Sequence, residues 1–571
     1  MESRLASAAF VLVFAVYLFL ASVGGVARYI PEPRENAFNS LSRGLLSGHL
    51  YTTKEVPPGL AALADPYDPS ANVEFRTNAA YMVHDYSYYK GRMYLYFGVA
   101  PALLLFIPFH LLTGSWLSQW MAVALLCTAG LLVNVLLVRS VKKAFFPGSP
   151  AWILAASVLL LGFGSYAPIL LARADKWEVP IAFSYLFVSL TLRFLWEALG
   201  HPEKCARWVA LASLSLGIAF AGRPSVLPVG AILLLPFLLP EPRKSLRTWA
   251  AAILPLGFCG LGVALYNQMR FSSPFDFGQR YQLAAEKVSN MKIFSLEYLG
   301  ANLNLFLFKA VDWRSYFPFA NEPAYGASSK NHGMIEHLSG ALLNDPVLWA
   351  ALAIVAFVII RRPGARLGLF VAAAGWAFLS ALTLMALFCG ICSRYQFEFL
   401  PALALLAALG VMAAENALTG GRLALARCVW IPALIFSSAF TVLYSVNRIV
   451  EDHGTAAIVM TSKGDLRDAN HEVEIDRFLS PGDPLFRLES GVIMVAAGHQ
   501  AAAQSVFAAL TRDFPDYGLG HYNLGRVLAT EGRTDEAIAE LAEARRLAPD
   551  NMAVARDLNE ELAKRGPGNP R

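Results

Sequence analysis

Apolar runs long enough to cross a bilayer recur along this chain from Leu5 to Ser445 and then stop. The hydrocarbon core of a bilayer is about 30 Å thick, so an α-helix needs roughly 20 apolar residues to cross it. Only 16% of the 571 residues are charged, whereas a typical soluble domain has about 25%. We therefore predict an all-α membrane protein with many spans, followed by a polar tail.

Lysine and arginine are concentrated in short loops between the apolar runs. This placement is the positive-inside pattern of cytoplasmic loops. It also explains the formal net charge of +5 without nucleic acid, for which the chain has no recognisable binding motif. The basic loops are 139–143, 204–207, 243–247, 361–366 and 422–427.

The apolar run 97–113 conflicts with this pattern, because counting it as a span would place the basic loop 139–143 outside. The tyrosine-rich stretch "HDYSYYKGRMYLYFGVAP" leads into it, and tyrosine favours the bilayer boundary. We therefore predict that 97–113 lies on the outer surface as an interfacial helix. About eleven spans remain under this rule, near 6–27, 116–139, 150–171, 179–198, 207–222, 225–240, 248–267, 346–360, 367–388, 395–414 and 423–445.

The polar tail carries the spacing of tetratricopeptide repeats. Gly491, Ala503, Phe507 and Pro515 are followed 34 residues later by Gly525, Ala537, Leu541 and Pro549. We expect two helix-turn-helix repeats and a capping helix. Such stacks bind protein partners or simply pack, and the sequence leaves both open. The predicted domains are a membrane domain 1–446 with external loops 28–115 and 268–345, a linker 447–484, and the repeat domain 485–571.

Four charged residues crowd the short external turn "ARADKWEVP". Positive charges at an external turn run against the topological bias. Arg173 and Lys176, interleaved with Asp175 and Glu178, therefore predict a site that holds an anion beside a carboxylate.

Further candidates lie at the outer ends of other spans. A carboxylate at the membrane boundary, such as Glu35 or Asp85, can act as a general base if burial raises its pKa. Arg223 and Arg394 offer planar donors for a phosphate. The candidate binding set is completed by Tyr395 beside Arg394, and by Tyr88 and Arg280 in the aromatic external segments. Glu398 falls one turn after Arg394, with which it is expected to pair.

With these residues in place, the chain resembles the GT-C membrane glycosyltransferases, which include protein mannosyltransferases and lipid A aminoarabinose transferases. The resemblance rests on the acidic residue in the first external loop, the interfacial helix introduced by Pro101, the acidic turn 175–178, and "SRYQFEFLPALALL", which is similar to the "RY…P" start of a late helix. Arg34 and Glu35 stand where the family usually has an acidic pair. The base is therefore open between Glu35 and Asp85.

The resemblance implies a hexosyl- or pentosyltransferase that moves a sugar from a polyprenyl-phosphate donor to a glycan, lipid or protein at the outer face. A carboxylate would take the acceptor's proton, while Arg394, Arg223 or Lys176 would stabilise the leaving phosphate. A divalent ion could assist, although no residue set predicts a metal site. The expected location is a bacterial inner membrane with the tail on the periplasmic side. The alternative is a non-catalytic membrane scaffold or assembly factor that binds proteins through its repeats.

Overall fold

The computed structural model describes residues 2–24, 36–77, 81, 83–239, 245–323 and 334–565. The candidate base Glu35 lies outside the described residues. The chain divides into a membrane unit, Met1–Asp312 with Asn321–Ser445, and a tail unit, Trp313–Ala320 with Val446–Arg571.

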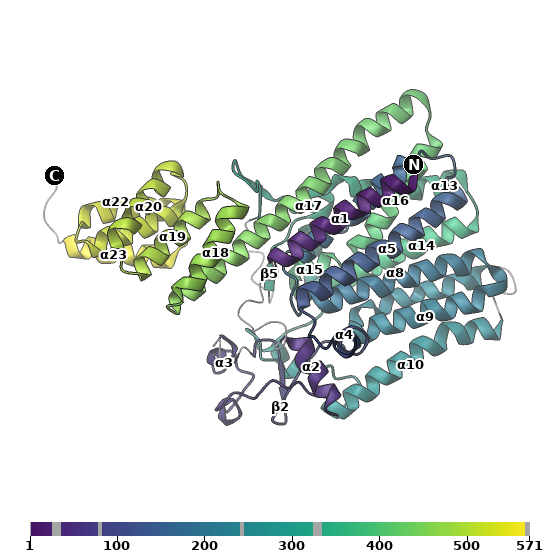
Figure 1. The fold of residues 1–571 in the computed structure, drawn as a ribbon, viewed down its shortest axis with the longest axis horizontal. Helices are drawn as coiled ribbons and strands as arrows, with labels where there is room; N and C mark the ends of the chain where they lie inside the picture. The colour runs from purple at the N-terminus through teal and green to yellow at the C-terminus, as the bar shows by residue number, and fades with distance from the viewer. Residues whose placement is uncertain are drawn as a thin grey trace. The chain divides into compact units, whose positions relative to one another are not determined.

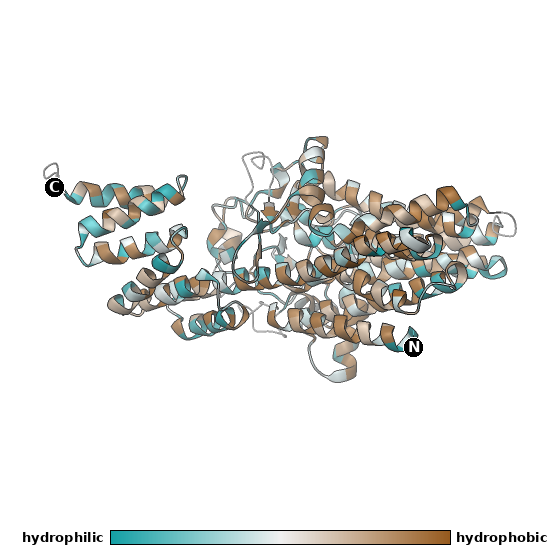
Figure 2. Ribbon diagram, turned by 90° about the horizontal axis from the view of Figure 1, so that it is seen from above, coloured by the Kyte–Doolittle hydropathy of each residue, from teal (hydrophilic) through white to brown (hydrophobic). Residues whose placement is uncertain are grey.

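In the described part of the chain, eight helical segments are long and apolar enough to cross a membrane (Figures 1 and 2). They are α1 (Glu2–Gly24), α5 (Gln119–Phe145), α8 (Glu178–Gly200), Pro202–Gly222 containing α9 (Cys205–Gly222), α10 (Leu246–Phe271), α14 (Ala365–Ala386), α16 (Leu400–Ala417) and α17 (Gly420–Ser462). Shorter apolar helices coincide with the other expected spans: α6 (Trp152–Phe163) with α7 (Ala167–Leu171), η4 (Pro224–Leu238), and η9 (Pro346–Ala350) with α13 (Ala351–Arg361). The all-α membrane fold is confirmed, whereas the number of eleven crossings stays a prediction.

The basic ends of several spans meet at one end of the bundle. The Lys142 ammonium, late in α5, lies 3.3 Å from the Glu2 carboxylate at the start of α1. The Arg366 guanidinium, at the start of α14, donates to the Trp196 carbonyl near the end of α8 at 3.2 Å. The opposite ends of these helices therefore share the other side, as the alternation of basic loops predicts.

The run 97–113 forms a short π-helical turn, η2 (Ala102–Phe106), followed by α4 (Ile107–Thr113). Twelve helical residues rise only about 18 Å, which is too short for a hydrocarbon core of about 30 Å. Leu111 and Leu112 are 69% and 85% exposed, as expected of side chains that contact lipid. These dimensions fit a surface-lying helix.

Small strands and helices form the external parts of the membrane unit. β1 (Ser87–Tyr89) and β2 (Arg92–Tyr94) make an antiparallel hairpin, and β5 (Met334–Glu336) pairs in parallel with β6 (Gly390–Cys392). The second pairing places Glu336 opposite Cys392, two residues before Arg394. The external helices are α2 (Ala37–Leu46), α3 (Val73–Thr77), α11 (Leu299–Phe308), α12 (Ala341–Asn344) and α15 (Ser393–Gln396).

Close packing between α16 and η9 depends on a glycine. A Cβ added at Gly410 would lie 1.8 Å from the Ala350 carbonyl oxygen, whereas one at Gly375 on α14 would meet nothing within 4 Å. We expect Gly410→Ala to destabilise the fold by about 1–3 kcal/mol through overpacking. Gly375→Ala should leave the Tm unchanged or raise it, since alanine favours helix. Equal Tm values for the two variants in detergent would contradict this packing.

A buried carboxyl predicts a pH dependence of stability. Asp345, just before η9, is fully buried, and burial raises its pKa to about 7 despite the nearby Ser437 hydroxyl. The folded state therefore binds this proton more tightly than the unfolded chain, in which aspartate has a pKa of about 3.9. The resulting stabilisation is complete below pH 4 and is lost as the pH rises to about 7, by up to roughly 4 kcal/mol. Asp345→Asn should make the Tm less dependent on pH between pH 5 and 8. A variant whose Tm varies with pH as steeply as that of the wild type would contradict this.

The tail unit has the expected repeats, α19 (Pro484–Ala496) with α20 (Gln500–Asp513) and α21 (Gly518–Thr530) with α22 (Thr534–Leu547), followed by α23 (Met552–Arg565). Gly491 faces Phe507, and Gly525 faces Leu541, so closely that a Cβ would lie 2.3 Å and 2.8 Å from those side chains. The repeat glycines thus let paired helices approach. The segment 447–484, expected as a linker, is helical: α17 continues to Ser462, and α18 covers Leu466–Leu479.

Candidate functional site

The candidate site lies at the end of the bundle opposite the basic loops, and it centres on the Trp177 indole. Three cations approach this ring: the Lys176 Nζ at 4.5 Å, the Arg173 Cζ at 4.7 Å and the Arg394 Cζ at 5.6 Å from its centroid. Trp177 immediately precedes α8 and Arg394 lies in α15. We call these four side chains, with Asp85, Glu178 and Glu336, the outer cluster.

Asp85 is held by donors on both carboxylate oxygens. The Trp177 Nε1 donates to Oδ2 at 2.8 Å, and the Gln282 Nε2 donates to Oδ1 at 2.5 Å. The backbone of Asp85 is left-handed, with φ 61°, a conformation that aspartate tolerates better than most residues. Its N–H donates to the Leu283 carbonyl at 2.9 Å, which fixes it beside the segment that carries Gln282.

Electrostatics keep Asp85 ionised. Burial alone would raise its pKa, but His84, Lys176 and the bonds from Gln282 and Trp177 outweigh this effect, so that the pKa of Asp85 is lowered. Burial also lowers the pKa of Lys176, against the attraction of Asp85. Lys176 is 6% exposed, and its Nζ donates to the His84 carbonyl at 2.7 Å. Burial therefore does not leave Asp85 with a raised pKa, and Asp85 is a carboxylate at neutral pH.

Glu336 joins two of the cluster's arginines. One carboxylate oxygen accepts from the Arg394 Nη1 at 2.9 Å, and the other pairs with the Arg173 guanidinium. Because β5 holds Glu336 in register with β6, this carboxylate ties the turn before α8 to the start of α15. Nothing in the spacing of the sequence signals Glu336, Trp177 or Gln282 as members of the site.

The two acids of the turn 175–178 have different surroundings. Asp175 Oδ1 accepts from the Lys176 N–H at 2.6 Å and from the Gln119 Nε2 at 2.5 Å, so Asp175 shapes the turn. Glu178 is 2% exposed, and its Oε2 accepts from the Asp175 N–H at 3.1 Å. An acid in the first turn suits the positive end of the helix dipole. Glu178 remains inside the cluster, where it faces the charges of Arg173 and Arg394.

Arg223 forms an ion pair with Glu398. The Arg223 Nε donates to Glu398 Oε1 at 2.8 Å, and the Ser225 hydroxyl donates to Oε2 at 2.7 Å. The expected Arg394–Glu398 pair is therefore wrong, because α15 ends at Gln396 and α16 begins only at Leu400, so the two residues do not share one helix. Tyr395 links the two arginines, with Arg223 Cζ at 5.6 Å and Arg394 Cζ at 5.4 Å from its ring centroid.

Two predicted binding residues lie in other surroundings. Arg280 pairs through its Nε with Asp276 Oδ2 at 2.6 Å, and its guanidinium lies over the Tyr281 ring. Tyr88 is buried in strand β1, where its carbonyl accepts from the Tyr67 hydroxyl at 2.9 Å. Both contact sets lie in the aromatic external segments, and none includes a member of the outer cluster.

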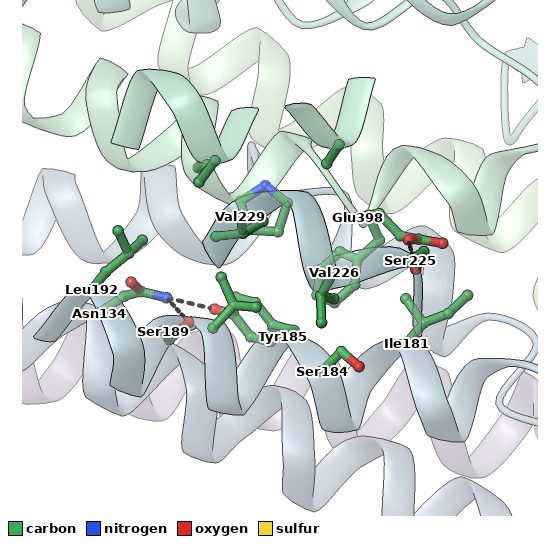
Figure 3. Close-up of a pocket in the computed structure, with 16 residues that line it drawn as sticks. Asn134, Ile181, Ser184, Tyr185, Ser189, Leu192, Ser225, Val226, Val229 and Glu398 are labelled. Atoms are coloured by element: carbon green, nitrogen blue, oxygen red, sulfur yellow. Dashed lines mark hydrogen bonds between the residues drawn. The ribbon is translucent and has the colours of Figure 1, made fainter. Parts of the chain in front are cut away.

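A pocket lies between α8, η4 and α14 (Figure 3). Figure 3 shows Asn134 and Ser189 at one end and Ser225 and Glu398 at the other. At the first end the Asn134 Nδ2 donates to the Ser189 hydroxyl at 2.9 Å. Its α8 lining, from Ile181 to Leu192, spans about 16 Å of helix rise. The remaining walls are largely aliphatic.

The cluster places a proton acceptor next to cations that can bind an anion. It offers an ionised carboxylate and three cations that can stabilise a developing negative charge. The apolar pocket is lined at one end by Glu398, which accepts from Arg223. Among the described residues of this cluster, no three His, Cys, Asp or Glu side chains converge as a metal site requires.

No family model matches the chain, and no curated protein matches it. Among solved structures, ArnT from Cupriavidus metallidurans bound to undecaprenyl phosphate is 13% identical, with a TM-score of 0.38 over 87% of this chain and 79% of that one. Apo ArnT is 16% identical, with a TM-score of 0.38 over 90% and 77%. Yeast Tom70 is 9% identical, with a TM-score of 0.19 over 76% and 96%. Similarity at this level does not extend to the site or the reaction, which are inferred from the chain's own residues.

Proposed function

We propose that the chain is a membrane glycosyltransferase that moves a sugar from a polyprenyl-phosphate donor to an acceptor hydroxyl at the outer face. The observation that carries this proposal is the meeting of three cations with Asp85 around Trp177. A phosphate leaving group needs the cations, and an acceptor hydroxyl needs the carboxylate.

The proposed reaction is a single displacement. Asp85 takes the proton of the acceptor hydroxyl while that oxygen attacks the anomeric carbon, and the bond from this carbon to the phosphate oxygen breaks. The bonding electrons leave with the lipid phosphate, whose charge Arg394, Arg173 and Lys176 stabilise. Attack opposite the leaving group inverts the anomeric centre. Glu178, in the same cluster, is the alternative base.

The apolar pocket supports a lipid-linked donor. Its outer end reaches Glu398, which holds Arg223 beside Tyr395, so a prenyl chain in the pocket would bring its phosphate toward Arg394. In this proposal the basic loops face the cytoplasm of a bacterial inner membrane, and the cluster faces the periplasm. The tail follows the last span and lies on the periplasmic side.

A donor panel tests the proposal. Purified protein in nanodiscs is given radiolabelled polyprenyl-phosphate sugars or the corresponding nucleotide sugars, together with a membrane-extract acceptor. We expect label transfer from a polyprenyl-phosphate sugar only. Transfer from nucleotide sugars would refute the lipid donor, and inactivity of the folded protein with every donor would favour the non-catalytic scaffold.

A further inference from the structure

The tail unit includes eight residues from far upstream in the chain, Trp313–Ala320. They form the tip of a hairpin whose strands are β3 (Asp312–Trp313) and β4 (Ala320–Asn321). Within the tip, the Arg314 N–H donates to the Phe319 carbonyl and the Phe319 N–H donates to the Tyr316 carbonyl, both at 2.8 Å. The tip is thus closed by its own main-chain bonds.

This hairpin tip contacts the helical part of the tail through main chain and side chain. The Ser480 hydroxyl, at the end of α18, donates to the Phe317 carbonyl at 2.6 Å, and Ser480 is fully buried. The Tyr316 ring meets the Phe514 ring edge to face, with centroids 5.8 Å apart. The edge-to-face arrangement is favoured between aromatic rings.

An electrostatic interaction and close main-chain packing also hold the hairpin tip against the tail helices. Arg314 lies near enough to Asp483, at the start of α19, to lower the pKa of that carboxyl, whose burial raises it. A Cβ added at Gly482 would reach 3.8 Å from the Tyr316 Cβ, so the main chain there passes close to the hairpin. The tail therefore presents a hydroxyl, an acid and an aromatic ring to one short segment.

We propose that the repeat tail has an internal ligand: the surface formed by Ser480, Asp483 and Phe514 binds the hairpin tip of its own chain. Tethering supports this occupant over a foreign peptide, because a covalently linked segment is present at an effective concentration in the mM range. The inference does not depend on the reaction proposed above.

Hydrogen–deuterium exchange of the full chain in nanodiscs tests this binding. We compare wild type with Phe514→Ala and Tyr316→Ala, and use Phe478→Ala, a tail phenylalanine that is 79% exposed, as the matched control. Amides of 313–320 should exchange about 3- to 10-fold faster in the first two variants and unchanged in the control. Unchanged exchange at 313–320 in both Phe514→Ala and Tyr316→Ala would overturn the proposal.

A folding control and a second variant keep the result interpretable. Unchanged exchange in α21 and α22 shows that the tail is folded. If Phe514→Ala unfolds the tail, Ser480→Ala replaces it, because this change removes one hydrogen bond to the hairpin tip with little change in volume.

Discussion

Asp85→Asn is expected to lower kcat for sugar transfer by about 10²- to 10⁴-fold, the usual contribution of a general base. The amide cannot take the acceptor's proton. It can still accept from the Trp177 Nε1, and the Gln282 amide can turn to offer its carbonyl, so the bonds around position 85 can be kept. The KM for the donor should therefore change little. Single-turnover transfer and steady-state kinetics separate the two effects.

Asp68→Asn is the matched control for this variant. Asp68 lies in the same external loop, and its Oδ1 accepts from the Ser70 N–H at 2.8 Å and from the Ser70 hydroxyl at 2.7 Å, bonds that asparagine can preserve. The control should transfer sugar at the wild-type rate. If Asp85→Asn does so as well, Asp85 is not the base, and Glu178→Gln becomes the decisive variant.

Arg394→Ala is expected to lower kcat by about 10²- to 10³-fold, because a donor aimed at the developing charge of the phosphate is lost. Arg394→Lys keeps the charge but loses the planar guanidinium that can donate two parallel hydrogen bonds. Its kcat should lie between those of Arg394→Ala and the wild type. The control is Arg92→Ala, since Arg92 is an exposed external arginine that stacks on Tyr51 at 4.4 Å outside the cluster. Wild-type kcat and KM in Arg394→Ala would remove Arg394 from the site.

The alanine variant should also alter the cluster's structure. Glu336 would lose its hydrogen bond from Arg394 and keep its pairing with Arg173. A combined Arg394→Ala and Glu336→Gln variant also removes the Glu336 charge and leaves Arg173 without this carboxylate partner. We expect it to be less thermally stable than Arg394→Ala and to remain inactive.

Local patterns in the sequence were enough to predict the fold class and part of the cluster. The length and spacing of apolar runs report burial in lipid directly, and the basic loops report sidedness, so the bundle and its two ends followed from them. Arg173, Lys176 and Glu178 stood out because charges at an external turn oppose the topological bias. Arg394 was found from its place at the start of a late span.

The rest of the cluster could not be predicted because it depends on contacts between distant segments. Gln282 reaches Asp85 across 197 positions of sequence, and Glu336 reaches Arg173 across 163. No spacing rule relates such residues. Tyr88 and Arg280 lie outside the cluster although their local composition matches it, because the fold places their contacts in the aromatic external segments. The Arg394–Glu398 pairing failed because a helical spacing rule was applied across a break between helices.

Cryo-electron microscopy of the chain in nanodiscs with polyprenyl phosphate shows whether the outer cluster binds the lipid phosphate. We predict density for the phosphate within hydrogen-bond distance of Arg394, with the prenyl chain leading into the pocket lined by Ile181, Tyr185 and Val226. Phosphate density away from Arg394, Arg173 and Lys176, with that pocket empty of lipid, would contradict it.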